Sequence, residues 1–410
     1  MDKRHAGVIM AAAVLMASPV RASGFAFYEQ GAKASGQAGA WVARADDASA
    51  NWYNPAALVN LTGVEIQFGA NYLDIGSDTS FTSALGATSG TTFDAISSVE
   101  TPAQFYFSQK VSERFAWGVG INNPFGLVTE WDDFPLTLSS RRAELVTFLL
   151  NVNFAFRLHK YWSFGAGADY LSAEVKDFSR DTVIVLPGPT PTPTTANLTG
   201  TGDGFGYNAA LQFKRDHISV AAQYRSGMSP EIEGTLEFSG LPGTFLNSSA
   251  SAKVELPSQA MIGAAYTSKR FDVEADAYYT AWNVFKSLEI QTPNPATSAT
   301  LIENWSATWS YRLGLAFRLG KDLQHEIRAG GVWDESPVPT EYLRPSIPDS
   351  DRTGYSLGYG WQGRHVGVDV YGMQIDFDDA TANGLLADGV IPGTYESSIL
   401  LLGGTFKYRF

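Results

Sequence analysis

The chain has 410 residues, of which 17% are charged and 13% aromatic, and its formal charge is −13. That acidity argues against nucleic acid as a partner, because phosphates would repel it, and the lack of cysteine excludes disulfides and thiolate chemistry. Soluble proteins carry roughly 25% charged residues, so the low value here leaves room for either a few soluble domains or one large barrel.

The first residues predict export. A basic start, Lys3 and Arg4, precedes an apolar run over residues 6–17. The run is too short to span a bilayer, and Ala22 is a small residue of the kind that a signal peptidase accepts. We therefore interpret residues 1–22 as a cleaved signal peptide. No later stretch reaches the roughly 20 apolar residues of a membrane helix, so the exported chain is either soluble or a closed barrel.

The next segment, residues 23–60, shows no sustained alternation. It is rich in glycine and alanine, poor in charge, and contains Trp41, Trp52 and Tyr53. A wide barrel encloses a lumen that side chains of its wall alone cannot fill. We therefore expect these residues to form an N-terminal hatch inside a barrel made by residues 61–410. A disordered tail is the alternative, but the aromatic residues make it a poorer fit.

Long alternating segments follow the hatch. In residues 146–158 and 305–319, apolar side chains occupy every second position and polar or small ones the positions between. A period of two indicates strands with one lipid-facing and one lumen-facing side, long enough to cross a membrane at a tilt. About fourteen such segments can be recognised, an even number that predicts an all-β, antiparallel transmembrane barrel. They span residues 62–74, 101–111, 114–122, 141–158, 161–177, 203–214, 216–238, 250–268, 270–290, 301–319, 323–334, 351–361, 363–377 and 395–410.

The connections alternate strictly between short and long. The short ones are tight and mostly charged, as in His159-Lys160 and Ser268-Lys269-Arg270. The long ones include residues 75–100, 123–140 and 178–202. Short periplasmic turns and long extracellular loops are typical of outer-membrane barrels, whereas a soluble sandwich has no reason to sort its loops this way. The predicted location is the bacterial outer membrane.

Two details concern the last strands. Val366, Val368 and Val370 share a face, but the following apolar residues occupy the opposite phase. Because a one-residue slip turns every side chain to the other face, a β-bulge is predicted near residues 370–372. The chain ends on an amphipathic strand closed by Phe410, which resembles the signal read by the barrel assembly machinery.

Several motifs occur in order along the chain. They are Ser23-Gly24-Phe25-Ala26-Phe27-Tyr28-Glu29-Gln30, Asp46-Asp47-Ala48, Asn54-Pro55-Ala56-Ala57-Leu58, Asn123-Pro124-Phe125-Gly126-Leu127, Trp162-Ser163-Phe164-Gly165, Ser336-Pro337-Val338-Pro339, Ile347-Pro348-Asp349 and Asp351-Arg352. This set resembles the long-chain fatty acid transporters of the outer membrane and their relatives that import toluene-like hydrocarbons. The resemblance spans nearly the whole exported chain.

That resemblance implies a mechanism. Ligand is captured in an apolar groove among the extracellular loops, passes to an apolar pocket near the N-terminus, and leaves sideways through a kink in the third strand. By position, the ligand would meet Gly24, Phe25 and Phe27. The hatch motif is Asn54, Pro55 and Ala56, and the kink would involve Gly118, Gly120, Asn123 and Pro124. The implied partners are a long-chain fatty acid or similar hydrophobic molecule and the surrounding outer-membrane lipid.

Ligand charge is the open question. Burying a dozen methylenes contributes on the order of 10 kcal/mol before binding costs, whereas one charge-assisted hydrogen bond adds about 1.5–3 kcal/mol. A cation would therefore select acids over hydrocarbons without setting the overall affinity. Candidates on predicted inward faces are Arg157, Lys176, Arg312 and Arg318; for each, pairing with a barrel carboxylate such as Asp272 is the stronger interpretation.

An enzyme is not expected. The sequence contains no H-E-x-x-H, no G-x-S-x-G and no P-loop, and it predicts no metal site or cofactor. A general diffusion porin for small hydrophilic solutes is the main alternative, and it would leave the hatch unexplained. An outer-membrane lipid hydrolase would need a Ser/His pair that cannot be placed.

Overall fold

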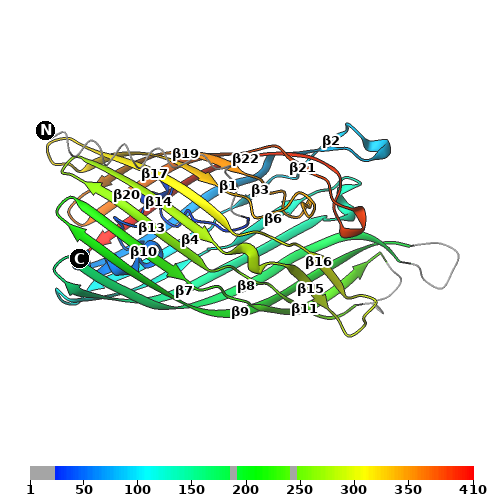
Figure 1. Ribbon diagram of the computed structural model, residues 1–410, viewed down its shortest axis with the longest axis horizontal. Helices are drawn as coiled ribbons and strands as arrows, with labels where there is room; N and C mark the ends of the chain where they lie inside the picture. Colours follow the sequence, from blue (N-terminus) through cyan, green and yellow to red (C-terminus); the bar gives the residue numbers. More distant parts are fainter. Residues whose placement is uncertain (1–23, 185–191, 241–246) are drawn as a thin grey trace.

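The computed structural model describes residues 24–184, 192–240 and 247–410. Fourteen antiparallel strands form one barrel, which closes where β1 (Val64–Ser83) pairs with β22 (Gly393–Arg409). Short turns and the C-terminus lie at one end of the barrel, and the long loops lie at the other (Figure 1). The predicted fold class and strand number are confirmed, while the predicted signal peptide lies outside the described residues.

Six of the fourteen strands consist of two labelled segments, because their hydrogen bonding is interrupted. After β1, the segments in chain order are β3 (Ser98–Glu100) and β4 (Ala103–Lys110), β5 (Phe115–Asn122) and β6 (Gly126–Glu130), β7 (Arg142–His159), β8 (Trp162–Ile184), β9 (Thr192–Arg215), β10 (Ile218–Arg225) and β11 (Glu231–Ser239), β12 (Ser248–Lys253) and β13 (Gln259–Thr267), β14 (Phe271–Thr280) and β15 (Ser287–Gln291), β16 (Ala299–Ile302) and β17 (Thr308–Leu319), β18 (His325–Asp334), β19 (Arg352–Gln362), β20 (Val366–Phe377) and β22.

The remaining elements are short. Two small strands, β2 (Thr92–Asp94) and β21 (Ala380–Ala382), lie in the long loops. The helical turns are α2 (Ala32–Ser35), α3 (Ala50–Tyr53), η1 (Pro55–Asn60), η2 (Gly86–Thr88), η3 (Leu136–Leu138), η4 (Trp282–Val284) and η5 (Leu386–Asp388). Among the described residues, no helix has the length and apolar character needed to cross a membrane.

The alternation places apolar side chains outward, as expected. On β7, Phe148 and Phe154 are 53% and 45% exposed, whereas Asn151 and Asn153 between them are fully buried. Outward aromatic and aliphatic side chains suit contact with lipid, and the polar inward ones can hydrogen-bond to groups in the lumen.

Two sequence expectations were wrong. The predicted loop 178–202 is mostly strand, since β8 continues to Ile184 and β9 begins at Thr192. Above the membrane the outward face of a strand meets water and not lipid, so these Ser- and Thr-rich ends need no apolar outer face and do not alternate. The predicted bulge near residues 370–372 is also absent, because β20 keeps one register against β19 and β22. Instead the lumen itself becomes apolar there, where Tyr371 and Met373 are buried inward.

Residues 24–60, called the hatch segment from here on, lie inside the barrel. Their backbone groups bond to inward side chains of the wall. The amides of Trp41 and Val42 donate to the Asp276 carboxylate at 2.8 and 3.0 Å, and those of Ala43 and Arg44 donate to Glu274 at 2.6 and 3.2 Å. A buried non-helical backbone must find partners of this kind, so the polar inward faces of the strands are what allow the segment to fold there.

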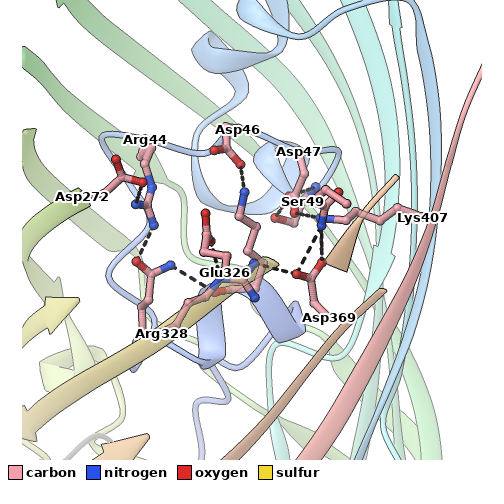
Figure 2. Close-up of polar contacts among 12 residues, drawn as sticks. Arg44, Asp46, Asp47, Ser49, Asp272, Glu326, Arg328, Asp369 and Lys407 are labelled. Carbon is pink, nitrogen blue, oxygen red and sulfur yellow. Dashed lines mark hydrogen bonds and ion pairs between the residues drawn. The ribbon is translucent and has the colours of Figure 1, made fainter. Parts of the chain in front are cut away.

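Buried ion pairs also join the hatch segment to the wall (Figure 2). Lys407 on β22 contacts Asp369 of β20 at 2.7 Å and Asp47 of the hatch segment at 3.3 Å. Arg44 of the hatch segment contacts Asp272 of β14 at 2.6 Å. All these side chains are at most 3% exposed, so each charge depends on its partner.

Lys407→Met should therefore loosen the hatch segment. Removing one partner of a buried ion pair costs about 3–5 kcal/mol, because the other charge stays buried and uncompensated. We expect the variant to unfold at a clearly lower temperature in detergent. The gel mobility of samples heated to increasing temperatures measures this. The matched control is Lys253→Met, since Lys253 is 59% exposed in its pair with Glu255; an equal loss in both variants would contradict the prediction.

Candidate ligand-binding site

The start of the hatch segment pairs with an interruption in the barrel wall. Ala26 forms an antiparallel bridge with Phe125. The Phe27 amide donates to the Pro124 carbonyl at 2.8 Å, and the Gly126 amide donates to the Phe25 carbonyl at 3.1 Å. The N-terminal residues thus lie against the wall as a short added strand.

The interruption lies between β5 and β6. Asn122 pairs with Leu149 of β7 and Gly126 with Val146, so residues 123–125 leave the ladder and the register shifts by one. Of the four residues predicted to form the kink, only Asn123 and Pro124 thus lie in this interruption. Gly118 and Gly120 stay in regular pairing with β4 and β7, and they are glycines because buried side chains approach them: an added Cβ would lie 2.4 Å from Asn51 Oδ1 at Gly118 and 2.5 Å from Asn151 Oδ1 at Gly120.

Phe25 is the centre of a buried aromatic cluster. Its ring lies 4.7 Å from that of Trp282, 5.6 Å from Trp305, 6.0 Å from Phe285 and 6.2 Å from Phe125, all edge-on. These five rings, called the aromatic box, are at most 6% exposed. Two of them, Phe25 and Phe125, belong to the two segments that pair at the interruption, so moving the N-terminal residues would open the box.

Three cavities run in series past the aromatic box. The outer cavity, of about 260 Å³, lies among extracellular strand ends and loops. The middle one, of about 70 Å³, shares Phe178 and Leu198 with it and is bounded by Phe25. The inner one, of about 160 Å³, shares Phe25 and Leu127 with the middle cavity and is lined by residues 24–27. Phe25 therefore lies between the middle and inner cavities, and the middle cavity is the smallest of the three.

Residues 347–349 and Arg352, which belong to two of the loop motifs, also line the inner cavity. The Gly24 amide donates to Asp349 Oδ2 at 3.1 Å, and Ser336 Oγ donates to the same oxygen at 2.9 Å. Burial raises the pKa of Asp349 to about 6. Arg352 lines the cavity and contacts Asp334 at 3.2 Å. Gly24 is thus adjacent in space to the motifs around residues 336, 349 and 352, although 325 residues separate it from Asp349 in sequence.

Two arginines line the outer cavity. Arg344 is held by Glu303 at 2.7 Å and by the carbonyls of Ile302 and Asp388 at 2.7 and 2.9 Å. In the described part of the chain, Arg180 forms no ion pair or hydrogen bond with any side chain, and its charged neighbour is Arg344. An unpaired cation beside apolar walls can bind an anion attached to an apolar chain.

Glu303 separates the outer and middle cavities. It lines the middle cavity and accepts a hydrogen bond from Trp305 Nε1 at 3.1 Å, while its partner Arg344 lines the outer one. Burial raises the pKa of Glu303 to about 7, although Arg344 opposes that rise. This carboxyl can therefore change charge near neutral pH, at the boundary between the outer and middle cavities.

The structure brings Gly24, Phe25 and Phe27 together at the cavities, but it separates the predicted cations from them. Arg157 donates to the Val59 carbonyl and to Asn60 near the periplasmic end. Lys176 sits at a register shift of β8, 44% exposed and paired with Glu144 at 3.0 Å.

The two remaining predicted cations are also structural. Arg312 is 1% exposed between Glu29 and Asp334, both at 3.6 Å, and Arg318 contacts Asp272 and Glu326. Lys176, Arg312 and Arg318 are thus paired with carboxylates, as the alternative expected, whereas Arg157 bonds to carbonyl and amide oxygens instead.

The hatch motif has a docking role. Asn54 donates from Nδ2 to the Val42 carbonyl at 2.7 Å and accepts from the Ala56 amide at 3.1 Å, which starts the turn η1 at Pro55. That turn rests on Gly165 of β8, where an added Cβ would lie 2.4 Å from the Ala56 nitrogen. The motif therefore positions the hatch segment, away from the cavities.

Sequence reasoning missed Arg180 and Arg344. Both fall in stretches that were expected to be long loops, where no period tells which side chain faces inward. The sequence indicated their role only weakly. Each is an arginine in a long predicted connection, Arg180 next to Ser179 and Arg344 next to Pro345. No group of three or more potential metal ligands occurs among the described residues.

The chain matches, over residues 13–410, the family described as "Outer membrane protein transport protein (OMPP1/FadL/TodX)". It is similar to the "Long-chain fatty acid transport protein" of Escherichia coli O6:H1, with 26% identity over 408 residues and 89% of each chain covered.

Solved structures share the fold. A Pseudomonas aeruginosa FadL homologue superimposes with a TM-score of 0.84 at 18% identity, covering 95% of this chain and 100% of that one. The Ralstonia pickettii toluene transporter TbuX gives a TM-score of 0.69 at 16% identity, covering 94% and 99%.

Proposed function

Because the chain belongs to the OMPP1/FadL/TodX family of outer-membrane transport proteins, we propose that it imports long-chain fatty acids, by capture in the outer cavity and sideways release at the β5–β6 interruption. Relatives are named for fatty acid transport and for toluene transport, so the family leaves both cargoes open. The observation that favours the acid is Arg180 in the wall of the outer cavity, a cation that forms no ion pair with any residue that the structure describes.

Capture would use both halves of the ligand. The alkyl chain would lie against Phe178, Leu198, Leu236 and Ile290, which line the outer cavity. Burial of the chain supplies most of the free energy, at ~0.8 kcal/mol per methylene, and the carboxylate bond to Arg180 adds about 1.5–3 kcal/mol. Affinity would thus depend on chain length and selectivity on the cation.

Transfer inward would displace Phe25. The middle cavity is too small for a long chain while the Phe25 ring fills the aromatic box. Withdrawal of residues 24–27 would break their pairing with residues 124–126 and uncover the interruption between β5 and β6. Ligand leaving there enters lipid directly, so it never has to cross an aqueous lumen.

The porin alternative has less support. A porin needs an open, hydrated lumen, whereas here the lumen contains a buried segment joined to the wall by ion pairs and backbone hydrogen bonds. Wild-type protein in planar bilayers should accordingly give no steady large conductance.

Arg180→Gln tests the carboxylate role. It should weaken binding of a long-chain fatty acid about ten- to hundredfold, the equivalent of ~1.5–3 kcal/mol, and leave binding of the methyl ester of the same acid unchanged. Competition against a fluorescent fatty acid measures both. Lys176→Gln is the control, because Lys176 lies outside the three cavities. Equal losses for acid and ester would refute the role of Arg180.

Binding should also depend on pH through Glu303. The pKa of Glu303 is raised to about 7, so the carboxyl loses its charge as the pH falls from 8 to 6. Arg344 then loses its competing partner and can attract a ligand anion. Binding of a long-chain alkyl sulfonate, which keeps its charge over this range, should tighten several-fold, and Glu303→Gln should bind tightly at both pH values. A variant that keeps the wild-type pH dependence would exclude Glu303 as the cause.

A further inference from the structure

The short turns at the periplasmic end carry a concentration of positive charge. Six exposed cations there form no ion pair among the described residues: Arg114, Lys160, Lys214, Lys269, Lys321 and Arg364. Two more exposed arginines, Arg215 and Arg270, lie in or directly beside the same turns, where the exposed acids are three, Glu113, Asp216 and Asp322, besides the C-terminal carboxylate. The whole chain has a formal charge of −13, so the positive charge of this end is opposite in sign to that of the chain as a whole.

From this asymmetry we propose that the periplasmic rim binds the phosphates of anionic phospholipids in the inner leaflet. The cations lie in or directly beside all six short turns, between β4 and β5, β7 and β8, β9 and β10, β13 and β14, β17 and β18, and β19 and β20. They therefore surround the barrel (Figure 1). A ring of this kind fits the shell of lipid around a membrane protein, and electrostatic attraction draws anionic headgroups to basic residues at a membrane surface.

Aromatic side chains place these cations at the level of the headgroups. The Tyr161 ring lies 5.1 Å from Lys160 Nζ and 5.3 Å from the Arg215 guanidinium carbon. Trp162 and Phe213 follow on the adjoining strands, with ring centroids 5.1 Å apart. Aromatic girdles mark the membrane–water interface of outer-membrane barrels, so a phosphate at that depth lies within reach of Lys160 and Arg215.

An acidic protein is a weaker candidate for the occupant. A stable protein interface buries about 800 Å² on each partner as one contiguous patch, whereas these cations are spread over turns of two to five residues around a barrel. Cations of the extracellular half differ in a further respect, since Arg141, Arg142 and Lys253 are neutralised by neighbouring carboxylates. Exposed cations without an ion pair thus gather at the periplasmic turns, whereas Arg180, which forms none among the described residues, lines the outer cavity.

The test uses the full protein in vesicles of phosphatidylethanolamine with a minority of phosphatidylglycerol. Spin-labelled lipids measure how much of each lipid is immobilised on the protein. We expect severalfold enrichment of phosphatidylglycerol, reduced by high salt, and a fall toward no preference when Arg114, Lys160, Lys214, Lys269, Lys321 and Arg364 are all changed to Gln. Lys160→Gln with Arg215→Gln should give a partial loss.

The control is Lys253→Gln with Lys286→Gln at the extracellular end, which should keep the full enrichment. Wild-type protein without any preference for phosphatidylglycerol, or a six-site variant that retains it, would overturn the proposal and leave an acidic protein as the partner to consider. Fatty acid binding at the outer cavity should be normal in the rim variants, so this test is independent of the proposed cargo.

Discussion

Gly165→Ala should open the barrel to ions without preventing its insertion. The added Cβ would lie 2.4 Å from the Ala56 nitrogen and 2.5 Å from the Pro55 carbonyl carbon. Both contacts are with backbone, so no side chain can rotate away and η1 must leave its place on β8. Overpacking of this kind typically costs 1–3 kcal/mol, and once the hatch segment separates from the wall, water can fill the lumen. Planar bilayers should then show steady openings that the wild type lacks.

Gly330→Ala should have the same effect from the opposite side, since its Cβ would lie 2.2 Å from the Gln37 carbonyl carbon. Gly404→Ala on β22 is the matched control, because its nearest neighbour would be 3.7 Å away. Heat-modified gel mobility confirms that each barrel has formed. Closed channels in folded Gly165→Ala and Gly330→Ala proteins would show that the hatch segment does not seal the lumen.

The strands could be predicted from sequence because lipid imposes a strict rule. Each crossing segment must be apolar on one face and can be polar on the other. In residues 146–158 the residue types alone therefore tell which side chains face the lipid and which face the lumen. The rule does not apply beyond the lipid: the outward faces of the extracellular ends of β8 and β9 meet water, and these ends were mistaken for a loop. It also fails where the lumen is apolar, as at Tyr371 and Met373, where a change of phase was interpreted as a bulge.

The candidate site was predicted only in part. Residues 24–27 and 123–124 were identified through family resemblance, and the structure places them side by side. The cations were not predictable, because a buried arginine that fastens the hatch segment, such as Arg312, has the same sequence pattern as one that faces a cavity. Only the folded loops distinguish Arg180, which has no carboxylate beside it in the described chain, from the paired arginines.

A reversible crosslink between residues 26 and 125 should abolish transport. Ala26 and Phe125 face each other as a pair flanked by hydrogen bonds from Phe27 to Pro124 and from Gly126 to Phe25. In this arrangement the Cα atoms lie on the order of 4.5 Å apart, which is within the range that a disulfide spans. Since the natural chain has no cysteine, Ala26→Cys with Phe125→Cys would form one defined bond.

A matched control uses the same chemistry away from the cavities. Thr381 and Thr394 are cross-strand partners of β21 and β22 in the extracellular loops. A disulfide between cysteines at these positions should leave transport unchanged, oxidised or reduced. Binding of fatty acid at the outer cavity should persist in both crosslinked proteins, because Arg180 and its apolar neighbours are untouched.

Uptake of labelled palmitate by cells that depend on this protein, measured with the 26–125 crosslink closed and then reduced, tests the sideways route most directly. Withdrawal of residues 24–27 from the interruption predicts that uptake stops when the bond forms and returns when it is reduced. Full uptake through the oxidised protein would contradict the route, because the ligand would then be leaving without moving the N-terminal residues from the wall.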